Sequence, residues 1–216
     1  MIAHLMPTIA LTISVLAADA ARAQGSDSVP AGWGKSGNRP TEYAGTVDHA
    51  VYRSGRGSGQ LRSLVATASG TGVLAQGIRA DSLRGARIRV SAWLRTRDVH
   101  EVRFFARVDG PGTVLDFGNA DGDPLTGTVD WKLREIVIDV PNDAIGVTFG
   151  LVLAGIGTTW IDDVVVSSVP KATPRTGTPP ARETASAEME RMMRERYAAK
   201  PARPQNVGFE ERVGRP

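Results

Sequence analysis

The sequence predicts an all-β fold in which two antiparallel sheets pack as a sandwich, and three observations support this prediction. Short apolar stretches recur between residues 60 and 169, separated by turns rich in Gly, Pro, Asn and Asp. No helical pattern interrupts them there. The 216 residues include 24 Gly and 13 Pro but only 6% aromatic residues, a balance that suits a turn-rich β domain better than a helical bundle.

About eight segments in this region have the length and composition of strands. They lie at 60–67, 72–78, 86–96, 102–109, 113–117, 131–140, 146–154 and 159–169. Turn sequences such as Ser69-Gly70-Thr71-Gly72 and Asp109-Gly110-Pro111-Gly112 separate them. Because no helix intervenes, we expect the strands to pair in antiparallel fashion within residues 24–169.

The first 23 residues have the pattern of a signal peptide. Residues 5–18 are mostly apolar but too few to span a bilayer, and Ala21-Arg22-Ala23 supplies the small residues of a cleavage site before Gln24. The segment before the apolar run has no Lys or Arg, so a buried N-terminal helix is the alternative. We expect a secreted or periplasmic protein without a transmembrane segment.

The basic residues gather near the C-terminus. The sequence pI is about 9.6, and residues 170–216 hold ten Lys/Arg against six Asp/Glu. The formal net charge of the whole chain is +3, so the remainder is close to neutral. A nucleic-acid-binding module concentrates positive charge on its folded face, and we therefore expect no nucleic-acid partner.

Few residues could support catalysis. The chain has no Cys, and His49 and His100, the two histidines beyond the leader, do not form a ligand-spaced cluster. No nucleophile elbow, phosphate-binding loop or glycosidase-type carboxylate pair is recognisable. These observations predict a protein that is not an enzyme.

The tail divides into three parts. Residues 170–182 form a Pro-rich linker, and residues 183–200 predict an amphipathic helix with Met189, Met193 and Tyr197 on one face. The alternatives for this segment are a helix that docks on the sandwich or frays in solvent, a helix that binds a partner or a membrane surface, and disorder. Residues 201–216 form the final segment.

Several segments together resemble the galactose-binding-like jelly rolls, in particular carbohydrate-binding modules of families 4, 9 and 22. The segments that carry the resemblance include Pro30-Ala31-Gly32-Trp33, Arg84-Gly85-Ala86-Arg87-Ile88-Arg89-Val90-Ser91-Ala92-Trp93 and Thr159-Trp160-Ile161-Asp162-Asp163-Val164. The resemblance covers about residues 29–169. It implies a jelly-roll sandwich that binds glycans, often as an accessory to an exported enzyme.

One departure from the family pattern concerns a strand that such modules carry before the Gly-Trp pair. Its Asn-x-x-Phe-Glu pattern is absent there, and the matching string is Asn206-Val207-Gly208-Phe209-Glu210. We expect residues 206–211 to supply the missing edge strand, within the chain or by strand exchange in a homo-oligomer. A chance match in a disordered tail is the alternative.

A structural calcium ion is implied by the same resemblance. Asp162 and Glu210 match positions near that ion in the family, and Asp163 is a further candidate ligand. Independently, an aspartate pair inside an apolar strand is costly to bury unless it is paired or bound to a cation. The alternative is that one aspartate faces solvent while the other caps a turn.

A ligand-binding face follows from strand alternation. Ile88, Val90, Ala92 and Leu94 should face the core, which leaves the alternate positions of this segment and the next on the outside. If residues 86–96 and 102–109 pair as a hairpin, Trp93 lies opposite Phe105 or Arg103. The candidate ligand-binding residues are Trp93, Phe105, Arg89, Arg95, Arg103, Arg107 and Asp109.

The chemistry of this face favours an acidic glycan, because aromatic rings stack on sugars and Arg donates several hydrogen bonds to carboxylates or sulfates. Arginines that merely stack on rings of a solvated sheet, or a face covered by the tail helix, are the alternatives. We therefore expect an exported, non-catalytic carbohydrate-binding module. The alternative function is protein–protein interaction in the cell envelope, or a structural role there.

Overall fold

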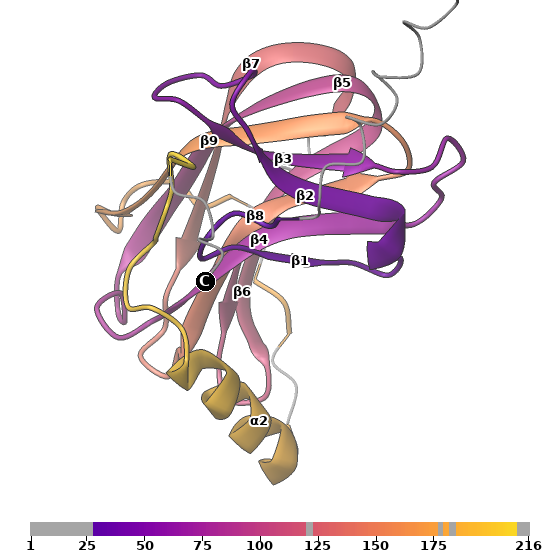
Figure 1. Cartoon of the computed structure of the whole chain (residues 1–216). Helices are drawn as coiled ribbons and strands as arrows, with labels where there is room; N and C mark the ends of the chain where they lie inside the picture. Colours follow the sequence, from indigo (N-terminus) through magenta and orange to yellow (C-terminus); the bar gives the residue numbers. More distant parts are fainter. Residues whose placement is uncertain (1–27, 120–122, 177–178, 182–184, 211–216) are drawn as a thin grey trace, which may run out of the picture.

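The computed structural model describes residues 28–119, 123–176, 179–181 and 185–210, and these residues are mainly strands (Figure 1). The elements in chain order are β1 (Gly34–Ser36), the 3-10 turn η1 (Pro40–Glu42), β2 (Tyr43–Asp48), β3 (Ser58–Ser63), β4 (Thr71–Arg79), β5 (Arg87–Asp109), β6 (Val114–Asn119), β7 (Leu125–Asp139), β8 (Gly146–Ala154), β9 (Thr158–Val169) and the helix α2 (Ala187–Ala198). All strand pairs are antiparallel.

The strands form two layers that share the long strand β5. Its second part, residues 101–109, lies between β8 and β6, and β4 and β1 continue this layer, which we call the β8 sheet. Its first part, residues 87–97, lies between β7 and β9, and β3 and β2 continue this layer, the β9 sheet. The predicted antiparallel two-sheet sandwich of jelly-roll type is confirmed (Figure 1).

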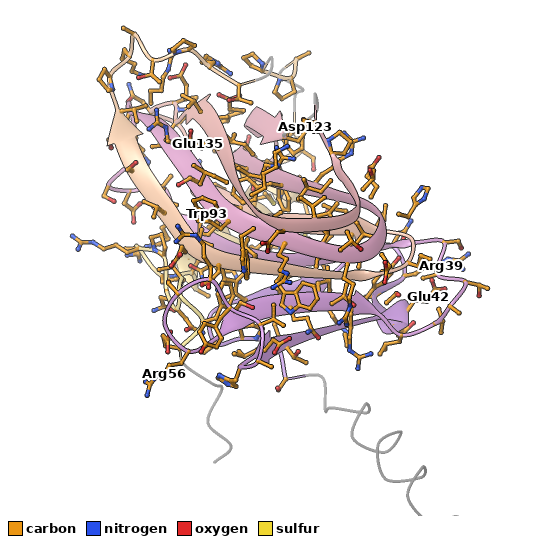
Figure 2. All side chains as sticks on the ribbon, turned by 90° about the horizontal axis from the view of Figure 1, so that it is seen from above. Arg39, Glu42, Arg56, Trp93, Asp123 and Glu135 are labelled. Atoms are coloured by element: carbon orange, nitrogen blue, oxygen red, sulfur yellow. The ribbon has the colours of Figure 1, made fainter. Side chains whose placement is uncertain are left out.

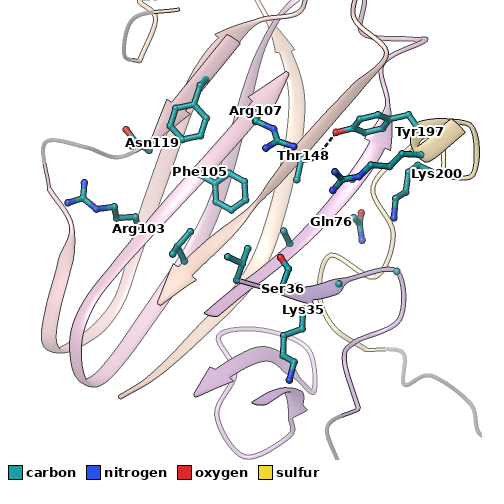
Figure 3. A pocket seen from close by; sticks show the side chains of 18 residues that line it. Lys35, Ser36, Gln76, Arg103, Phe105, Arg107, Asn119, Thr148, Tyr197 and Lys200 are labelled. Carbon is teal, nitrogen blue, oxygen red and sulfur yellow. Dashed lines mark hydrogen bonds between the residues drawn. The ribbon is translucent and has the colours of Figure 1, made fainter. Parts of the chain in front are cut away.

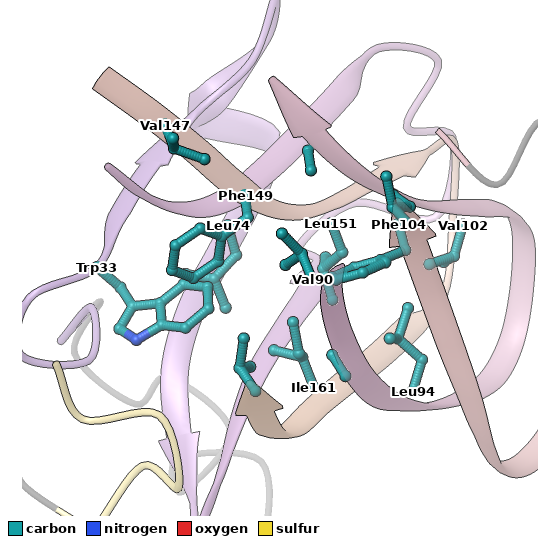
Figure 4. Packing of buried hydrophobic residues seen from close by; sticks show 14 of the residues in the cluster. Trp33, Leu74, Val90, Leu94, Val102, Phe104, Val147, Phe149, Leu151 and Ile161 are labelled. Atoms are coloured by element: carbon teal, nitrogen blue, oxygen red, sulfur yellow. The ribbon is translucent and has the colours of Figure 1, made fainter. Parts of the chain in front are cut away.

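The core lies between the two sheets and follows the predicted alternation. Ile88, Val90, Ala92 and Leu94 are fully buried, as the sequence predicts. In the second part of β5 the same parity continues, so Phe104 also faces inward and packs in the cluster seen in Figure 4. Alternate residues of β5 therefore lie on the outer faces of both sheets.

The predicted hairpin between residues 86–96 and 102–109 is wrong. These residues form one continuous strand, β5, and its two parts do not pair with each other. The first part pairs with β7 and β9, and the second part pairs with β8. The chain passes from one sheet to the other at Asp98, which adopts a left-handed backbone conformation with φ 53°. A single residue of this kind redirects the strand without reversing it.

The C-terminal tail packs against the sandwich that it follows. Helix α2 lies within the predicted range 183–200, and the Ser186 side chain caps it by accepting a hydrogen bond from the Met189 N–H. Beyond the helix, the Pro201 carbonyl accepts a bond from the Arg79 N–H, and the Gln76 side chain bonds both the N–H and the carbonyl of Gln205. The tail thus lies along the edge of β4 past the end of β1.

The segment that matches the family's first strand is buried, but it does not form a strand over residues 206–210. Phe209 is fully buried with its ring 4.8 Å from that of Trp33, and it closes a turn by donating its N–H to the Asn206 carbonyl. One bond joins this segment to β9, from the Val164 N–H to the Val207 carbonyl. The expected strand is corrected to a turn that packs within its own chain; residue 211 lies outside the described residues.

The predicted signal peptide, residues 1–23, also lies outside the described residues. Among the residues that are described, no helix has the length and apolar character needed to cross a membrane.

Candidate functional site

The outer face of the β8 sheet is hollowed across its strands. Phe105 on β5 lies opposite Gly150 of β8, which lies opposite Ala75 of β4, which in turn lies opposite Gly34 of β1. A row of such small residues leaves a trough beside the Phe105 ring, because neighbouring side chains of a sheet stand roughly perpendicular to it.

A second ring and several polar groups border this trough. Phe117 of β6 lies opposite Arg107, which places it diagonally next to Phe105 on the same face. Both rings are half-buried. Arg103, Asn119 and Thr148 also line this space, and Figure 3 shows Arg103 and Asn119 at one end of it and Thr148 at the other.

The result is a pocket of about 480 Å³ that opens on the outer face of the β8 sheet. Strand residues form its floor and one side, and three residues from helix α2 and the segment just after it, Arg196, Tyr197 and Lys200, form the other side. No Asp or Glu lines the pocket among the residues described. Its volume lies within the range of about 300–1,000 Å³ that is typical of small-ligand sites.

The predicted ligand-binding face is divided between two opposite faces of the sandwich. Phe105, Arg103 and Arg107 line the pocket of the β8 sheet. Trp93 lies on the outer face of the β9 sheet (Figure 2), in the part of β5 that also carries Arg89 and Arg95. The expected pairing of Trp93 with Phe105 is wrong because β5 crosses between the sheets instead of folding back on itself.

Trp93 is covered by a side chain that the sequence did not associate with it. The guanidinium of Arg53 lies over the indole, 3.9 Å from the ring centroid. Such a cation–π contact is worth about 0.5–1 kcal/mol at an exposed site. This matches the alternative in which an arginine stacks on a ring of a solvated sheet.

Each of the four predicted arginines has a carboxylate partner. Arg103 donates to Glu101 at 2.6 Å, and the Arg107 Nε lies 2.9 Å from Asp109 Oδ1. On the other face, Arg89 lies 3.4 Å from Glu135 and Arg95 lies 3.6 Å from Asp130. The hydrogen bond from Arg103 lowers the pKa of Glu101. The strand arginines can still donate hydrogen bonds, but their charges are balanced locally.

Asp109 has a structural role rather than the predicted contact with ligand. It is 1% exposed because Tyr197 of helix α2 covers it and donates its hydroxyl to the carboxylate. The Tyr197 hydroxyl also bonds Thr148 at 2.7 Å. Burial, together with the charge of Asp109, raises the pKa of Tyr197 to about 12. Asp109 therefore anchors the helix and is screened from the pocket.

The three predicted calcium ligands all bind one loop, residues 53–56. Asp162 is fully buried, and its carboxylate accepts bonds from the N–H groups of Arg53, Ser54 and Asp163 at 2.8–3.2 Å. Burial raises the pKa of Asp162, and these three donors oppose that effect. The Arg56 N–H donates to Glu210 at 2.6 Å.

Asp163 completes the set, because it pairs with the Arg53 guanidinium at 2.6 Å. In the described part of the chain, no group of three or more His, Cys, Asp or Glu residues is placed to hold a metal ion. The lone pairs that a calcium ion would need are directed instead at N–H donors, so this arrangement does not fit the ion. The calcium ion expected from the resemblance is thus not supported by the donors around Asp162.

The pocket residues that sequence reasoning missed include Phe117, Thr148, Arg196 and Lys200. Phe117 could have been found, because it is the last residue of the predicted strand 113–117, where an aromatic side chain at the edge of a sheet is available to a ligand. Arg196 and Lys200 lie within the predicted helical range 183–200, but nothing in the sequence shows where that helix docks. The small residues Gly34, Ala75 and Gly150 carry no periodic signal at all.

No family model matches the chain. A curated protein of Bacillus subtilis (strain 168), "Uncharacterized HTH-type transcriptional regulator YbfP", is 34% identical to it over 148 residues, which are 67% of this chain and 50% of that protein. The chain thus spans about half the length of that relative. The described residues contain one α-helix, so the two helices of a helix-turn-helix motif are not among them.

Solved structures similar to this chain include carbohydrate-binding modules. TmCBM61 in complex with β-1,4-galactotriose has a TM-score of 0.46 and 18% identity, covering 66% of this chain and 92% of that one. The CBM22-1 and GH10 modules of Clostridium thermocellum Xyn10B with xylohexaose have a TM-score of 0.47 and 12% identity, covering 65% and 27%. The CBM22-1 xylan-binding domain of Paenibacillus barcinonensis Xyn10C has a TM-score of 0.42 and 12% identity, covering 67% of this chain and 90% of that one.

Proposed function

We propose that this protein is a non-catalytic carbohydrate-binding module whose sugar lies in the pocket on the outer face of the β8 sheet. The observation that carries the proposal is the pair of half-buried rings, Phe105 and Phe117, beside a trough floored by small residues. Aromatic faces of this kind stack against the C–H faces of sugar rings, and the trough gives a ring space to approach them.

Polar groups around the trough are suited to sugar hydroxyls. Arg103 and Arg107 are held in fixed orientations by Glu101 and Asp109, and the remaining guanidinium N–H groups can donate. Asn119 and Thr148 add groups that donate and accept hydrogen bonds. A mostly apolar site with a few oriented polar groups is the usual design of a small-ligand pocket.

The proposal includes export from the cytoplasm. Its support is the apolar run at residues 5–18 and the small residues of Ala21-Arg22-Ala23. N-terminal sequencing of the mature protein from its native host should then begin at Gln24, and an intact N-terminus would contradict this part of the proposal.

A second candidate function is contact with another protein through the opposite face. Leu133 lies opposite Trp93 on the outer face of the β9 sheet and is 41% exposed, and Val165 on the neighbouring strand β9 is 51% exposed. Exposed apolar side chains gathered on one sheet face are a mark of interaction surfaces. This candidate corresponds to a role in the cell envelope without glycan binding.

Calorimetric titration with a panel of xylo-, cello- and galacto-oligosaccharides and tetragalacturonate tests the proposal. Phe105→Ala should weaken binding roughly tenfold or more, since a buried ring contributes about 1.5–3 kcal/mol. Trp93→Ala is the matched control, because it removes a ring from the opposite face, and binding should persist. The proposal would be overturned if no oligosaccharide of the panel binds, or if binding depends on Trp93 and not on Phe105. The absence of any binding would favour the protein-contact function.

A further inference from the structure

Helix α2 is fixed on the outer face of the β8 sheet by one side chain. The Tyr197 ring packs on Gly146 so closely that a Cβ atom at that position would lie 2.0 Å from Tyr197 Cε1. Its hydroxyl bonds Thr148 and the buried Asp109 carboxylate. The bond from the Arg79 N–H to the Pro201 carbonyl holds the chain just after the helix. The helix is therefore a fixed wall of the pocket rather than a loose tail.

Two cations flank Tyr197 on this wall. Arg196 precedes it, and Lys200 follows it by three residues, a spacing that places both side chains near the covered part of the sheet. A Cβ atom built on Gly77 would lie 3.8 Å from Lys200 Cε, so the lysine stem crosses the sheet face beside Thr148. Both Arg196 and Lys200 line the pocket, and Figure 3 shows Lys200 next to Tyr197.

These two charges differ from those of the strand arginines, because no carboxylate among the described residues pairs with them. Arg103 and Arg107 are neutralised by Glu101 and Asp109. Across the described residues, no hydrogen bond or ion pair involves the Arg196 guanidinium or the Lys200 ammonium. Lys35 of β1 also lines the pocket, but its ammonium donates to the Tyr43 carbonyl at 2.6 Å. Because no acidic residue described in the structure lines the pocket, its net charge is positive, and Arg196 and Lys200 of the tail contribute two of the charges.

We propose that Arg196 and Lys200 form an anion subsite, which makes the pocket select sugars that carry a carboxylate or sulfate group. This inference rests on the proposed function and deepens it: Phe105 and Phe117 bind the ring of the sugar, and the tail helix determines its charge class. The cations on the sandwich strands are engaged within the protein: Arg103 and Arg107 pair with carboxylates, and Lys35 donates to a backbone carbonyl. Charged hydrogen bonds from Arg and Lys to an anion are shorter and stronger than neutral ones.

The test compares three tetrasaccharide probes by calorimetric titration: tetragalacturonate, its methyl ester, which keeps the rings and removes the charges, and a heparin-derived tetrasaccharide for sulfate. The wild-type protein should bind at least one charged probe about tenfold or more tightly than the methyl ester. The double variant Arg196→Gln/Lys200→Gln should lose that preference and keep its affinity for the methyl ester. The ratio of the two charged probes distinguishes carboxylate from sulfate recognition.

The double variant Arg191→Gln/Arg194→Gln is the matched control, because it removes the same charge from exposed positions of α2 that do not line the pocket. It should retain the preference for the charged probe. Equal affinity of the wild-type protein for charged and methylated probes, or a preference that survives Arg196→Gln/Lys200→Gln, would overturn the anion subsite and leave the sugar site intact. If the wild-type protein binds none of the probes, or binds them no better than Phe105→Ala does, the proposed function itself is overturned.

Discussion

Replacement of Phe209 by Ala should destabilise the whole sandwich, although this residue lies in the last part of the described chain. Phe209 is fully buried, its ring lies 4.8 Å from that of Trp33, and Gly59 of β3 leaves the space that it fills. A Cβ atom on Gly59 would lie 2.4 Å from the Phe209 ring. Removing the ring therefore opens a cavity between the tail and the core.

The expected loss in the free energy of unfolding is about 3–5 kcal/mol, the usual cost of truncating a buried Phe to Ala. The lower end of this range applies if the tail collapses into the gap, because a smaller cavity then remains. For a domain of this size each 1 kcal/mol lowers Tm by about 2–4 °C, so Tm should fall by roughly 6–20 °C.

Urea denaturation followed by tryptophan fluorescence measures this loss, with Trp33 as a reporter next to the mutated site. Tyr52→Ala serves as the control, because Tyr52 is 43% exposed and should change stability little. A loss below about 1 kcal/mol for Phe209→Ala, similar to that of a surface residue, would refute the conclusion that the tail completes the core.

Three further predictions concern the pocket, the helix anchor and the acidic residues. Ala75→Leu should fill the trough and abolish sugar binding in the calorimetric panel while Tm changes little; binding that survives would contradict the position of the ligand. Burial raises the pKa of Tyr197 from about 10 in the unfolded chain to about 12, so the unfolded state ionises first and stability falls as pH rises from 10 toward 12. Tyr197→Phe should therefore lose less stability than the wild-type protein between pH 8 and pH 11. Urea denaturation at both pH values measures this difference, and an equal fall in the free energy of unfolding for the two proteins would contradict the prediction. Because N–H donors already satisfy Asp162, Tm should be equal in calcium and in chelator, whereas Asp162→Asn should lower stability by about 1–3 kcal/mol; a rise of Tm with calcium would contradict the first part.

Alternation within β5 was predictable from sequence, but its path was not. Each half has a period of two, so the inward residues Ile88 to Leu94 follow directly from the pattern. The same parity holds in both halves, and therefore it cannot show that they belong to different sheets. Polar residues at 97–101 suggest a turn, whereas one left-handed residue, Asp98, suffices to carry the strand across.

The tail shows a similar division. The Asn-x-x-Phe-Glu match correctly indicated that residues 206–210 belong to the sandwich, but not that Asn206 and Phe209 adopt left-handed backbone conformations that close a turn. Burial of the Phe209 ring offsets the strain of such a conformation. The helix pattern of α2 was visible in sequence, yet its docking depends on Gly146 and Asp109, which lie far away in the chain.

The first two strands were hidden for a related reason. β1 and β2 lie in a stretch rich in Gly, Ser and Pro, where local propensity favours turns. Tyr43 stabilises them through tertiary contacts: it is fully buried and donates its hydroxyl to the Gly70 carbonyl at 2.6 Å. Contacts between distant segments, rather than local pattern, determine both these strands and the floor of the pocket.

The most direct test of the sugar site is a map of amide chemical-shift changes during titration with tetragalacturonate. Saturable changes should centre on Phe105, Phe117 and Thr148 and extend to the end of helix α2, because these elements enclose the pocket. Changes centred instead on Trp93 and Leu133 of the β9 sheet would place recognition on the opposite face and contradict the account.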